Sequence, residues 1–403
     1  MLACASGEVD AGFQPEYCDV ERAGSIKDRK RHTGAIVGPA MKIVHVETGR
    51  HLYGGAQQVL WLARGLAGAG TENVLVCPPG SDLARAAAAA GLDVRELACA
   101  GDHDVGFALR LRRNLKAWRP DVVHCHSRRG GDIMGGIAAR LAGIPALLSR
   151  RVDNPESAFA AQLRYRWFRR IVAISDNVAA VLHAQGIEQQ RVELIRSAVD
   201  VEQFAEPVDR DLLQSEFGIA GEHFAIAVVS QLIHRKGHRF LLDVLPGLLD
   251  LYPDIRVVFF GQGPEEERLR ALAAKLGITP IVCFAGFRSD LMRYLGGFDV
   301  LVHPATQEGL GVAMLEAASA GIPVIAFDAA GAAEAVAHAK TGILVPPNDL
   351  MMLQRAIAAL VEEPEMRLEF GIAGRARMRD EFDIGTMVER HLELYERILD
   401  DRT

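Results

Sequence analysis

A chain of 403 residues exceeds what one hydrophobic core usually holds and suits two domains of comparable size. Its hydrophobic fraction of 49% and charged fraction of 24% are typical of a globular protein, and no apolar run is long enough to span a membrane. The net charge of -7 argues against a nucleic-acid partner. The six cysteines lack C-x-x-C spacing, which favours reduced thiols and a cytoplasmic location.

The first 40 residues are polar and irregular, and they lack the apolar core of a signal peptide. We interpret residues 1–40 as a disordered extension or as the product of an upstream start codon, and we assign them no function. Met41 begins the stretch MKIVHVETG, whose Val and Ile content is typical of a first strand. The folded part of the chain is therefore expected to begin at residue 41.

From residue 42 onward, short Val- and Ile-rich runs alternate with longer helical patterns, which predicts parallel sheets covered by helices. Several of these runs are apolar at every position, as strands buried on both faces must be. The predicted strands are 42–47, 73–77, 121–126, 146–149 and 170–175 in the first half, and 224–231, 255–261, 281–286, 299–304 and 323–328 in the second.

The alternation breaks in VELIRSAVDVEQFAEPVDRD, where charged residues and proline predict a link between two doubly wound sheets. We place an N-terminal domain at 41–205 and a C-terminal domain at 206–385. Residues 386–403 are expected to form a helix that packs back toward the N-terminal domain.

Two glycines, Gly54 and Gly55, follow the first strand and precede an amphipathic pattern. Glycines there permit close approach of the backbone, and the free N–H groups of a helix start attract phosphate. The alternative is an ordinary strand-to-helix turn. The pattern G-x-G-x-x-G is absent here and after the strand at 255–261, which disfavours a nicotinamide enzyme.

A second candidate loop, SQLIHRKG, carries Arg235, Lys236 and Gly237 just after a predicted strand. The carboxyl end of a parallel strand is where open α/β sheets bind ligands, and a lysine there suits a diphosphate. The alternative is a solvated surface lysine.

The stretch EGLGVAMLEAASAGIPVIAFD places Glu308 in a loop and Glu316 within the following helix. The N–H groups of Gly309, Leu310 and Gly311 would point at an anion at the helix start. A carboxylate beside an anion is useful if it accepts hydrogen bonds from sugar hydroxyls, so one acid would hold a hexose and the other a ribose. Alternatively, Glu308 caps the helix and Glu316 lies on its polar face.

These residues belong to a series of motifs that resembles glycosyltransferase family 4 from about residue 41 to 385. The motifs are GGAQQ, HCHS, ELIRSAVD, SQLIHRKG, FFGQGPEEERL, FAGF, EGLGVAMLEAASAGIPVIA, GAAEAV and TGILVPP. The resemblance implies an α/β fold of GT-B architecture, with two Rossmann-like doubly wound parallel-sheet domains facing across a cleft. It implies that the domain at 41–205 is on the acceptor side and that the domain at 206–385 binds the nucleotide sugar. It also implies retaining transfer of a sugar from a nucleotide-diphosphate sugar to an acceptor hydroxyl, without a metal cofactor.

In the C-terminal domain, the resemblance implies that Glu308 contacts hydroxyls of the donor sugar and Glu316 the ribose. Leu310 and Gly311, following Gly309, would offer N–H groups to the diphosphate, which Lys236 would also bind.

In the N-terminal domain, the resemblance implies that Gly55 lies in the loop that closes over the phosphates. His126, the second histidine of HCHS, would face the donor sugar near the reacting carbon. The expected catalytic residues are thus His126, Lys236 and Glu308.

Two positions depart from the family pattern. Gln231 stands where an arginine is usual, which removes one positive charge from the diphosphate site, and Arg235 is the candidate replacement. Ser197 and Ala198 replace the usual Asn-Gly pair at an interdomain turn.

The segment 101–170 contains 14 Lys or Arg against 6 Asp or Glu, an excess of +8 inside an acidic chain. Arg128 and Arg129 follow one predicted strand and Arg150 and Arg151 another, so both pairs are candidate contacts for an anionic acceptor. The stretch QLRYRWFRR mixes aromatic and basic residues and suits an anionic membrane surface. Its alternative is a solvated helix with its aromatic side in the core.

We therefore expect an acceptor in a lipid-linked or anionic cell-envelope glycan such as lipopolysaccharide, and a location in the cytoplasm or at the inner face of its membrane. No D-x-D stands in a suitable loop, so no metal is expected. Two alternatives stay open: a nucleotide-sugar epimerase on the same scaffold, and a catalytically silent sugar-nucleotide-binding module, for which Gln231 is the support.

Overall fold

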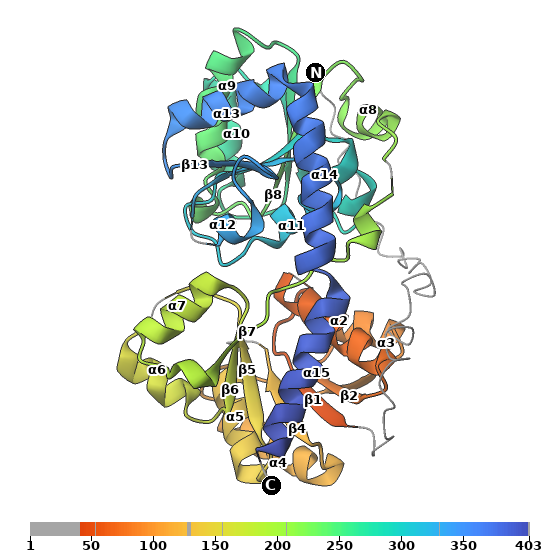
Figure 1. Cartoon of the computed structure of the whole chain (residues 1–403), viewed down its shortest axis with the longest axis vertical. Coiled ribbons are helices and arrows are strands. Elements are labelled where there is room, and N and C mark those ends of the chain that lie inside the picture. The colour runs from red at the N-terminus through yellow and green to blue at the C-terminus, as the bar shows by residue number, and fades with distance from the viewer. Residues whose placement is uncertain are drawn as a thin grey trace. The chain divides into compact units, whose positions relative to one another are not determined.

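The computed structural model describes residues 41–52, 54–126, 130–154, 156–206, 208–329 and 331–401. The prediction for residues 1–40 lies outside them. The chain divides into two compact domains (Figure 1). The N-terminal domain runs to Ala198 and includes Ile384–Thr403, and the C-terminal domain spans Val199–Asp383. The boundary between Ala198 and Val199 lies slightly before the expected one near residue 205.

The N-terminal domain is a sheet of seven parallel strands in the order β3-β2-β1-β4-β5-β6-β7. The strands are β1 (Lys42–Val46), β2 (Glu72–Cys77), β3 (Asp93–Glu96), β4 (Val122–Cys125), β5 (Ala146–Arg150), β6 (Arg170–Ala173) and β7 (Val192–Leu194). The helices are α2 (Gly54–Gly68), α3 (Asp82–Ala89), α4 (Val105–Trp118), α5 (Gly131–Ala142), α6 (Ala158–Tyr165), α7 (Asp176–Ala184) and α15 (Ile384–Asp400), with a short 3-10 turn η3 (Gln189–Arg191).

Helix α15 completes the core of the N-terminal domain although it is the last element of the chain. Its residues Val388, Leu394 and Tyr395 pack with Trp61 of α2 and with strands β1, β4, β5 and β6. A Cβ on Gly65 of α2 would lie 2.3 Å from a methyl of Val388, so the two helices approach where one side chain is absent. Such contact requires a small residue at that position.

The C-terminal domain is a sheet of six parallel strands in the order β10-β9-β8-β11-β12-β13. The strands are β8 (Phe224–Val229), β9 (Ile255–Phe260), β10 (Val282–Gly286), β11 (Val300–His303), β12 (Val324–Phe327) and β13 (Gly342–Val345). The helices are α8 (Asp211–Phe217), α9 (His238–Leu249), α10 (Glu266–Lys275), α11 (Val312–Ser319), α12 (Ala332–Ala335), α13 (Leu350–Glu362) and α14 (Pro364–Glu381). The 3-10 turns are η4 (Glu202–Phe204), η5 (His234–Lys236), η6 (Thr279–Ile281), η7 (Leu291–Arg293) and η8 (Leu295–Gly297).

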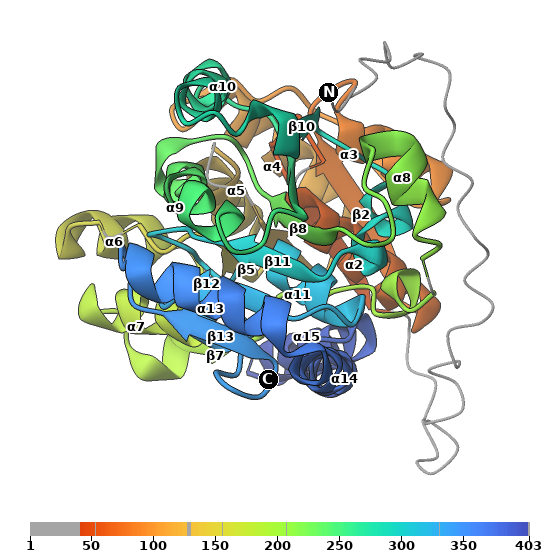
Figure 2. The same ribbon diagram turned by 90° about the horizontal axis from the view of Figure 1, so that it is seen from above.

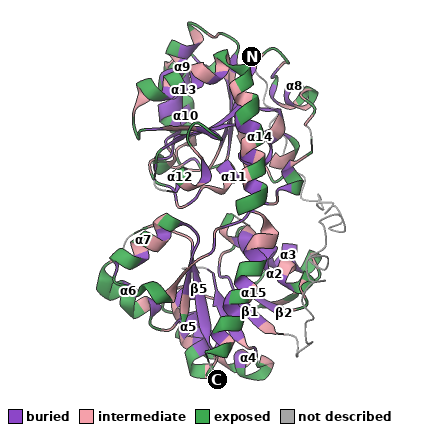
Figure 3. Ribbon diagram, viewed as in Figure 1, coloured by how far each residue is buried: buried purple, intermediate pink, exposed green. Residues whose placement is uncertain are grey.

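Helices cover both faces of the C-terminal sheet. Helices α9, α10 and α13 pack beside one another on one face, and α11 lies against α14 (Figure 2). The central strands are buried, whereas the outer surfaces of the helices are exposed (Figure 3). This two-faced burial explains why the strands read as continuous apolar runs.

All ten predicted strands are present, but the structure adds β3, β7 and β13. Each of these is an edge strand of its sheet, and none is completely buried. Strands β3 (DVRE) and β7 (VEL) carry charged residues, and β13 (GILV) is apolar but only four residues long, so none of them gave a clear strand pattern.

No helix among the described residues is long and apolar enough to cross a membrane. Among the described residues, Cys77, Cys99 and Cys125 carry free thiols.

Candidate functional site

In the C-terminal domain, the candidate site lies where β8 and β11 end. These strands are neighbours, with Val300 opposite Ile226, so the loops that leave them emerge side by side. The amide of Thr306 donates to the carbonyl of Arg235 at 2.9 Å and ties the two loops together. Parallel topology thus brings the lysine loop to the loop that carries Glu308.

Glu308 lies at the centre of this cluster, only 8% exposed. Its Oε2 accepts a hydrogen bond from the ammonium of Lys236 and another from Nε2 of His303 at 2.7 Å. Its Oε1 accepts from the amide of Gly309 at 3.1 Å. Burial alone would raise the pKa of Glu308, but the hydrogen bond from His303 and the charge of Lys236 outweigh it and lower the pKa well below its usual range. Glu308 is therefore a carboxylate at neutral pH.

His303 was not among the predicted site residues. It is the last residue of β11, and burial lowers the pKa of its imidazole. Its position in the sequence could have identified it as a site residue, because a histidine at the carboxyl end of a buried strand lies among the ligand-binding loops.

Glycines hold these loops close together. Gly237 has φ of +69°, and a Cβ there would lie 1.9 Å from the carbonyl oxygen of Pro304. Gly331 donates to the carbonyl of Glu308 at 3.1 Å, and a Cβ at that residue would lie 2.4 Å from the carbonyl carbon of Gly309. Neither position has space for a side chain, so the loop around Glu308 is fixed on two sides.

Four other predicted donor-site residues differ in their surroundings. Gln231 and Arg235 are exposed just after β8 and in η5, and the Arg235 guanidinium donates to the carbonyl of Gln307 at 3.3 Å. The side chain of Leu310 is buried, so its contribution to a ligand would come from its backbone N–H. Gly311, with φ of +81°, directly precedes α11.

Glu316 lies within α11, as predicted, and its side chain is partly buried. Burial raises its pKa from 4.5 to about 7. The carboxyl group is therefore poised to lose its proton near neutral pH.

This raised pKa predicts a pH-dependent stability. Below about pH 4.5 the group is protonated in both the folded and unfolded states, between 4.5 and 7 only the unfolded chain ionises, and above 7 both do. Because the unfolded state then binds fewer protons, the free energy of unfolding falls as pH rises through this window. We expect Glu316→Gln to match the native melting temperature at pH 4 and to exceed it at pH 8, as measured by calorimetry. Parallel melting profiles would contradict this.

The N-terminal domain holds a separate group of predicted site residues. His126 directly follows β4 and is 3% exposed, and its amide donates to the carbonyl of Val46 at 2.9 Å. Gly55 lies in the first turn of α2, where a Cβ would be 3.4 Å from Cδ of Arg151. The first turn of α2 and Arg151 therefore lie together at the carboxyl edge of this sheet.

His126 belongs to a group of buried imidazoles. His45 and His124 lie beside it, and the ring centroids of His124 and His126 are 3.8 Å apart. Burial lowers the pKa of His45 to about 4 and the pKa values of His124 and His126 well below the usual range. All three rings are neutral at physiological pH.

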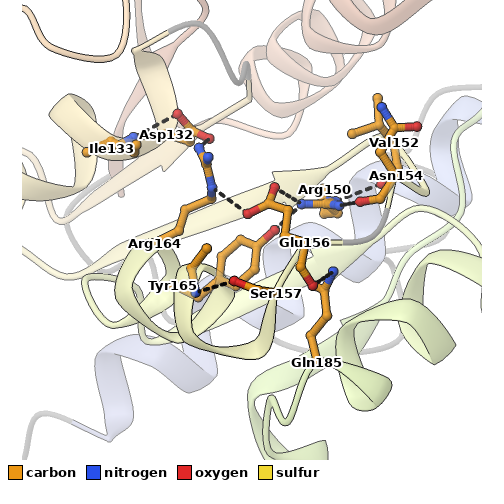
Figure 4. Close-up of polar contacts among 11 residues, drawn as sticks. Asp132, Ile133, Arg150, Val152, Asn154, Glu156, Ser157, Arg164, Tyr165 and Gln185 are labelled. Atoms are coloured by element: carbon orange, nitrogen blue, oxygen red, sulfur yellow. Dashed lines mark hydrogen bonds and ion pairs between the residues drawn. The ribbon is translucent and has the colours of Figure 1, made fainter.

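The structure corrects the predicted acceptor role of Arg150. This side chain is 2% exposed and donates to the carbonyls of Val152 and Asn154, to the hydroxyl of Tyr165 and to Glu156 (Figure 4). Its five donors are thus largely used within the domain. Arg150, the last residue of β5, is therefore a structural residue that holds the loop after this strand.

Arg151 faces a different environment from Arg150. Its Nη1 lies 3.4 Å from the hydroxyl of Ser197, and its buried Nε has no partner among the described residues. Burial lowers the pKa of Arg151 to about 10, so the guanidinium keeps its charge. Arg151 stays a candidate anion contact, whereas the predictions for Arg128 and Arg129 lie outside the described residues.

The stretch 162–170 (QLRYRWFRR) agrees in part with the alternative to membrane contact, a solvated helix whose aromatic side lies in the core. Tyr165 and Phe168 are buried, so they cannot face a membrane. Instead, Phe159 and Leu163, one helical turn apart on α6, are exposed by 79% and 45%.

Two family profiles match the chain. The profile of group 1 glycosyl transferases matches residues 209–377, and that of Glycosyltransferase Family 4 matches residues 53–203. The chain belongs to glycosyltransferase family 4.

This family 4 glycosyltransferase is similar to proteins with named activities. The 2-deoxystreptamine glucosyltransferase of Streptomyces kanamyceticus is 27% identical over 313 residues, which cover 72% of this chain and 80% of the relative. The lipopolysaccharide core biosynthesis glycosyltransferase LpsD of Rhizobium meliloti is 26% identical over 288 residues, covering 72% and 78%.

A solved structure supports the fold. The Anabaena protein HepE, crystallised with UDP-glucose, aligns with a TM-score of 0.79 at 19% identity, over 89% of this chain and 100% of that one. With the two parallel sheets, this likeness confirms that the family 4 glycosyltransferase has the predicted GT-B type of fold, built from Rossmann-like domains.

Proposed function

We propose that this glycosyltransferase moves a sugar from a nucleotide-diphosphate sugar to an acceptor hydroxyl with retention of anomeric configuration. The observation that carries the proposal is the buried cluster of Lys236, Glu308 and His303 beside the glycine-rich start of α11. A fixed carboxylate suits the hydroxyls of a sugar, and a cation beside free N–H groups suits a diphosphate.

In this mechanism, negative charge develops on the leaving diphosphate as the sugar is transferred. Lys236, Arg235 and the N–H groups of Leu310 and Gly311 stabilise that charge, so no metal ion is required, whereas the N–H of Gly309 holds Glu308. Glu308 holds the hydroxyls of the donor sugar and Glu316 those of the ribose. The leaving phosphate accepts the proton of the acceptor hydroxyl on the same face of the sugar.

The acceptor belongs, in this proposal, to an anionic or lipid-linked glycan of the cell envelope. The basic excess of 101–170 and Arg151 support an anionic group, and one relative is named for lipopolysaccharide core biosynthesis. Exposed Phe159 and Leu163 beside Arg166 support peripheral contact with an anionic membrane from the cytoplasmic side.

Donor binding is the experiment that tests the proposal. We expect one class among UDP-, GDP- and ADP-sugars to raise the melting temperature of the purified protein in EDTA, because a ligand that binds the folded state stabilises it by mass action. UDP-glucose comes first, since HepE was solved with it. The same donor should support transfer in EDTA, and NMR of the product should show the anomeric configuration of the donor.

Three outcomes would contradict parts of this proposal. Activity abolished by EDTA and restored by a divalent metal would refute metal independence. Isomerisation of the donor without an acceptor would favour the epimerase. If a donor binds but is not turned over with any acceptor, the silent sugar-nucleotide-binding module is favoured.

A further inference from the structure

A chain of side-chain hydrogen bonds leads from the edge of the N-terminal sheet to His126. The amide nitrogen of Asn73 donates to both the carbonyl and the hydroxyl of Thr71, at 3.1 and 2.9 Å. Nε2 of His45 lies 3.1 Å from Oδ1 of Asn73. Nδ1 of His45 lies 3.0 Å from Nε2 of His126. Nothing in the transfer mechanism above uses Asn73 or His45.

The direction of each bond follows from the chemistry of the groups. Because the Asn73 nitrogen faces two oxygens of Thr71, Oδ1 faces His45, and a carbonyl oxygen can only accept. Nε2 of His45 must therefore carry the hydrogen. A neutral imidazole has one N–H, so Nδ1 of His45 is an acceptor, and Nε2 of His126 must donate to it.

One consequence is an unused acceptor on His126. With its hydrogen on Nε2, the ring carries its lone pair on Nδ1. That atom is buried and has no hydrogen-bond partner among the residues that the structure describes. A buried acceptor without a partner is costly, which points to a hydrogen-bond donor brought by a ligand.

We propose that Asn73 and His45 are positioning residues that hold His126 as the Nε2–H tautomer, so that Nδ1 accepts a hydrogen bond from a hydroxyl of the donor sugar. The role toward the sugar rests on the proposed function, whereas the tautomer does not. The deep burial of His45 and His126 supports neutral rings, and Asn73 is only 8% exposed.

The same imidazoles are close enough for a metal ion, since nitrogens of His45, His124 and His126 all lie within 4.8 Å of one another. Both nitrogens of His45 are already used. Those of His124 are used too, at 2.7 Å from the hydroxyl of Tyr395 and 2.8 Å from Oγ of Ser149. A metal would have to break such bonds, so the observations favour the hydrogen-bonded cluster.

Nitrogen-15 NMR of the imidazole rings tests the tautomer in the full-length protein without substrate. The His126 signals are assigned by their absence in His126→Gln. We expect the protonated nitrogen of His126 to be Nε2 in the native protein, and a native Nδ1–H form would overturn the proposal without any need of a variant. Addition of Zn²⁺ alone should leave these signals in place; stoichiometric binding that shifts all three rings would favour a metal site instead.

The variant Asn73→Leu keeps the approximate side-chain volume but removes the acceptor. His45 should then move its hydrogen to Nδ1 and donate to Nε2 of His126, which forces the His126 hydrogen onto Nδ1. The matched control is Ser149→Ala, which removes an equally buried partner from His124 without touching this route. If the tautomer of a folded Asn73→Leu protein stays native, the inferred route is wrong.

Transfer kinetics then test the role toward the sugar. We expect Asn73→Leu to lower kcat by at least about tenfold with little change in the donor KM, as loss of an orienting partner typically does. Ser149→Ala should keep native kcat. If Asn73→Leu changes the tautomer of His126 but keeps native kcat, the tautomer assignment stands and the proposed hydrogen bond between Nδ1 and the sugar is wrong. If the native protein transfers no sugar, the proposed function fails, and the NMR result still decides the tautomer.

Discussion

Glu308→Gln is expected to lower kcat for sugar transfer by about 10²- to 10³-fold, the usual loss when one preorganised group of a polar site is removed. The native carboxylate is held in its charged form by His303 and Lys236 and fixed by the amide of Gly309. Glutamine keeps the size of the side chain but loses the charge that balances Lys236 and one acceptor for sugar hydroxyls.

The control for this experiment is Glu267→Gln, an exposed position on α10 of the same domain. It removes the same charge from the protein without touching the cluster, so native kcat is expected. Circular dichroism and calorimetry should show that Glu308→Gln is folded, with a moderately lower melting temperature because Lys236 loses its ion-pair partner. A folded Glu308→Gln enzyme with full activity would remove Glu308 from the site.

Gly237→Ala is expected to destabilise the C-terminal domain by about 3 kcal/mol or more and to abolish donor binding. Two costs add at this residue. A non-glycine residue at φ of +69° is strained, and its Cβ would lie 1.9 Å from the carbonyl oxygen of Pro304. The clash must push the loop from Pro304 to Glu308 away from Lys236, so the site is damaged together with the fold.

The matched control separates these two costs. Gly277 has φ of +72°, but a Cβ there would meet no atom within 4 Å. Gly277→Ala should therefore lose only about 1 kcal/mol, the strain of the left-handed backbone, and should bind the donor normally. Urea denaturation and donor thermal shifts measure both variants. Equal losses in the two would mean that the close approach at Gly237 carries no energy.

The sequence predicted the two parallel-sheet domains because strands buried on both faces leave an unambiguous apolar signal. It also predicted that Lys236 and Glu308 belong to one edge, since each follows such a strand. Their direct ion pair was not predictable, because the adjacency of β8 and β11 depends on strand order, which the local pattern does not contain.

Arg150 and Arg151 show the limit of arguing from sequence position. They are neighbours after the same strand, yet one is enclosed by Glu156, Tyr165 and backbone carbonyls, and the other lies beside Gly55. Successive residues leave an extended segment in opposite directions, so a pair of arginines rarely shares one environment. Only the packed structure separates the structural arginine from the candidate ligand contact.

The membership of α15 in the first domain has a consequence for biosynthesis. A ribosome releases the strands and helices of the C-terminal sheet before it releases Ile384–Asp400. Nascent domains fold as units once their residues are available. The N-terminal sheet is made first, but it must wait with Trp61 and the β-strand surface beneath Val388 and Tyr395 uncovered until α15 has been made. The order of completion is thus the reverse of the order of synthesis, and the early sheet is the part that needs protection from aggregation in the meantime.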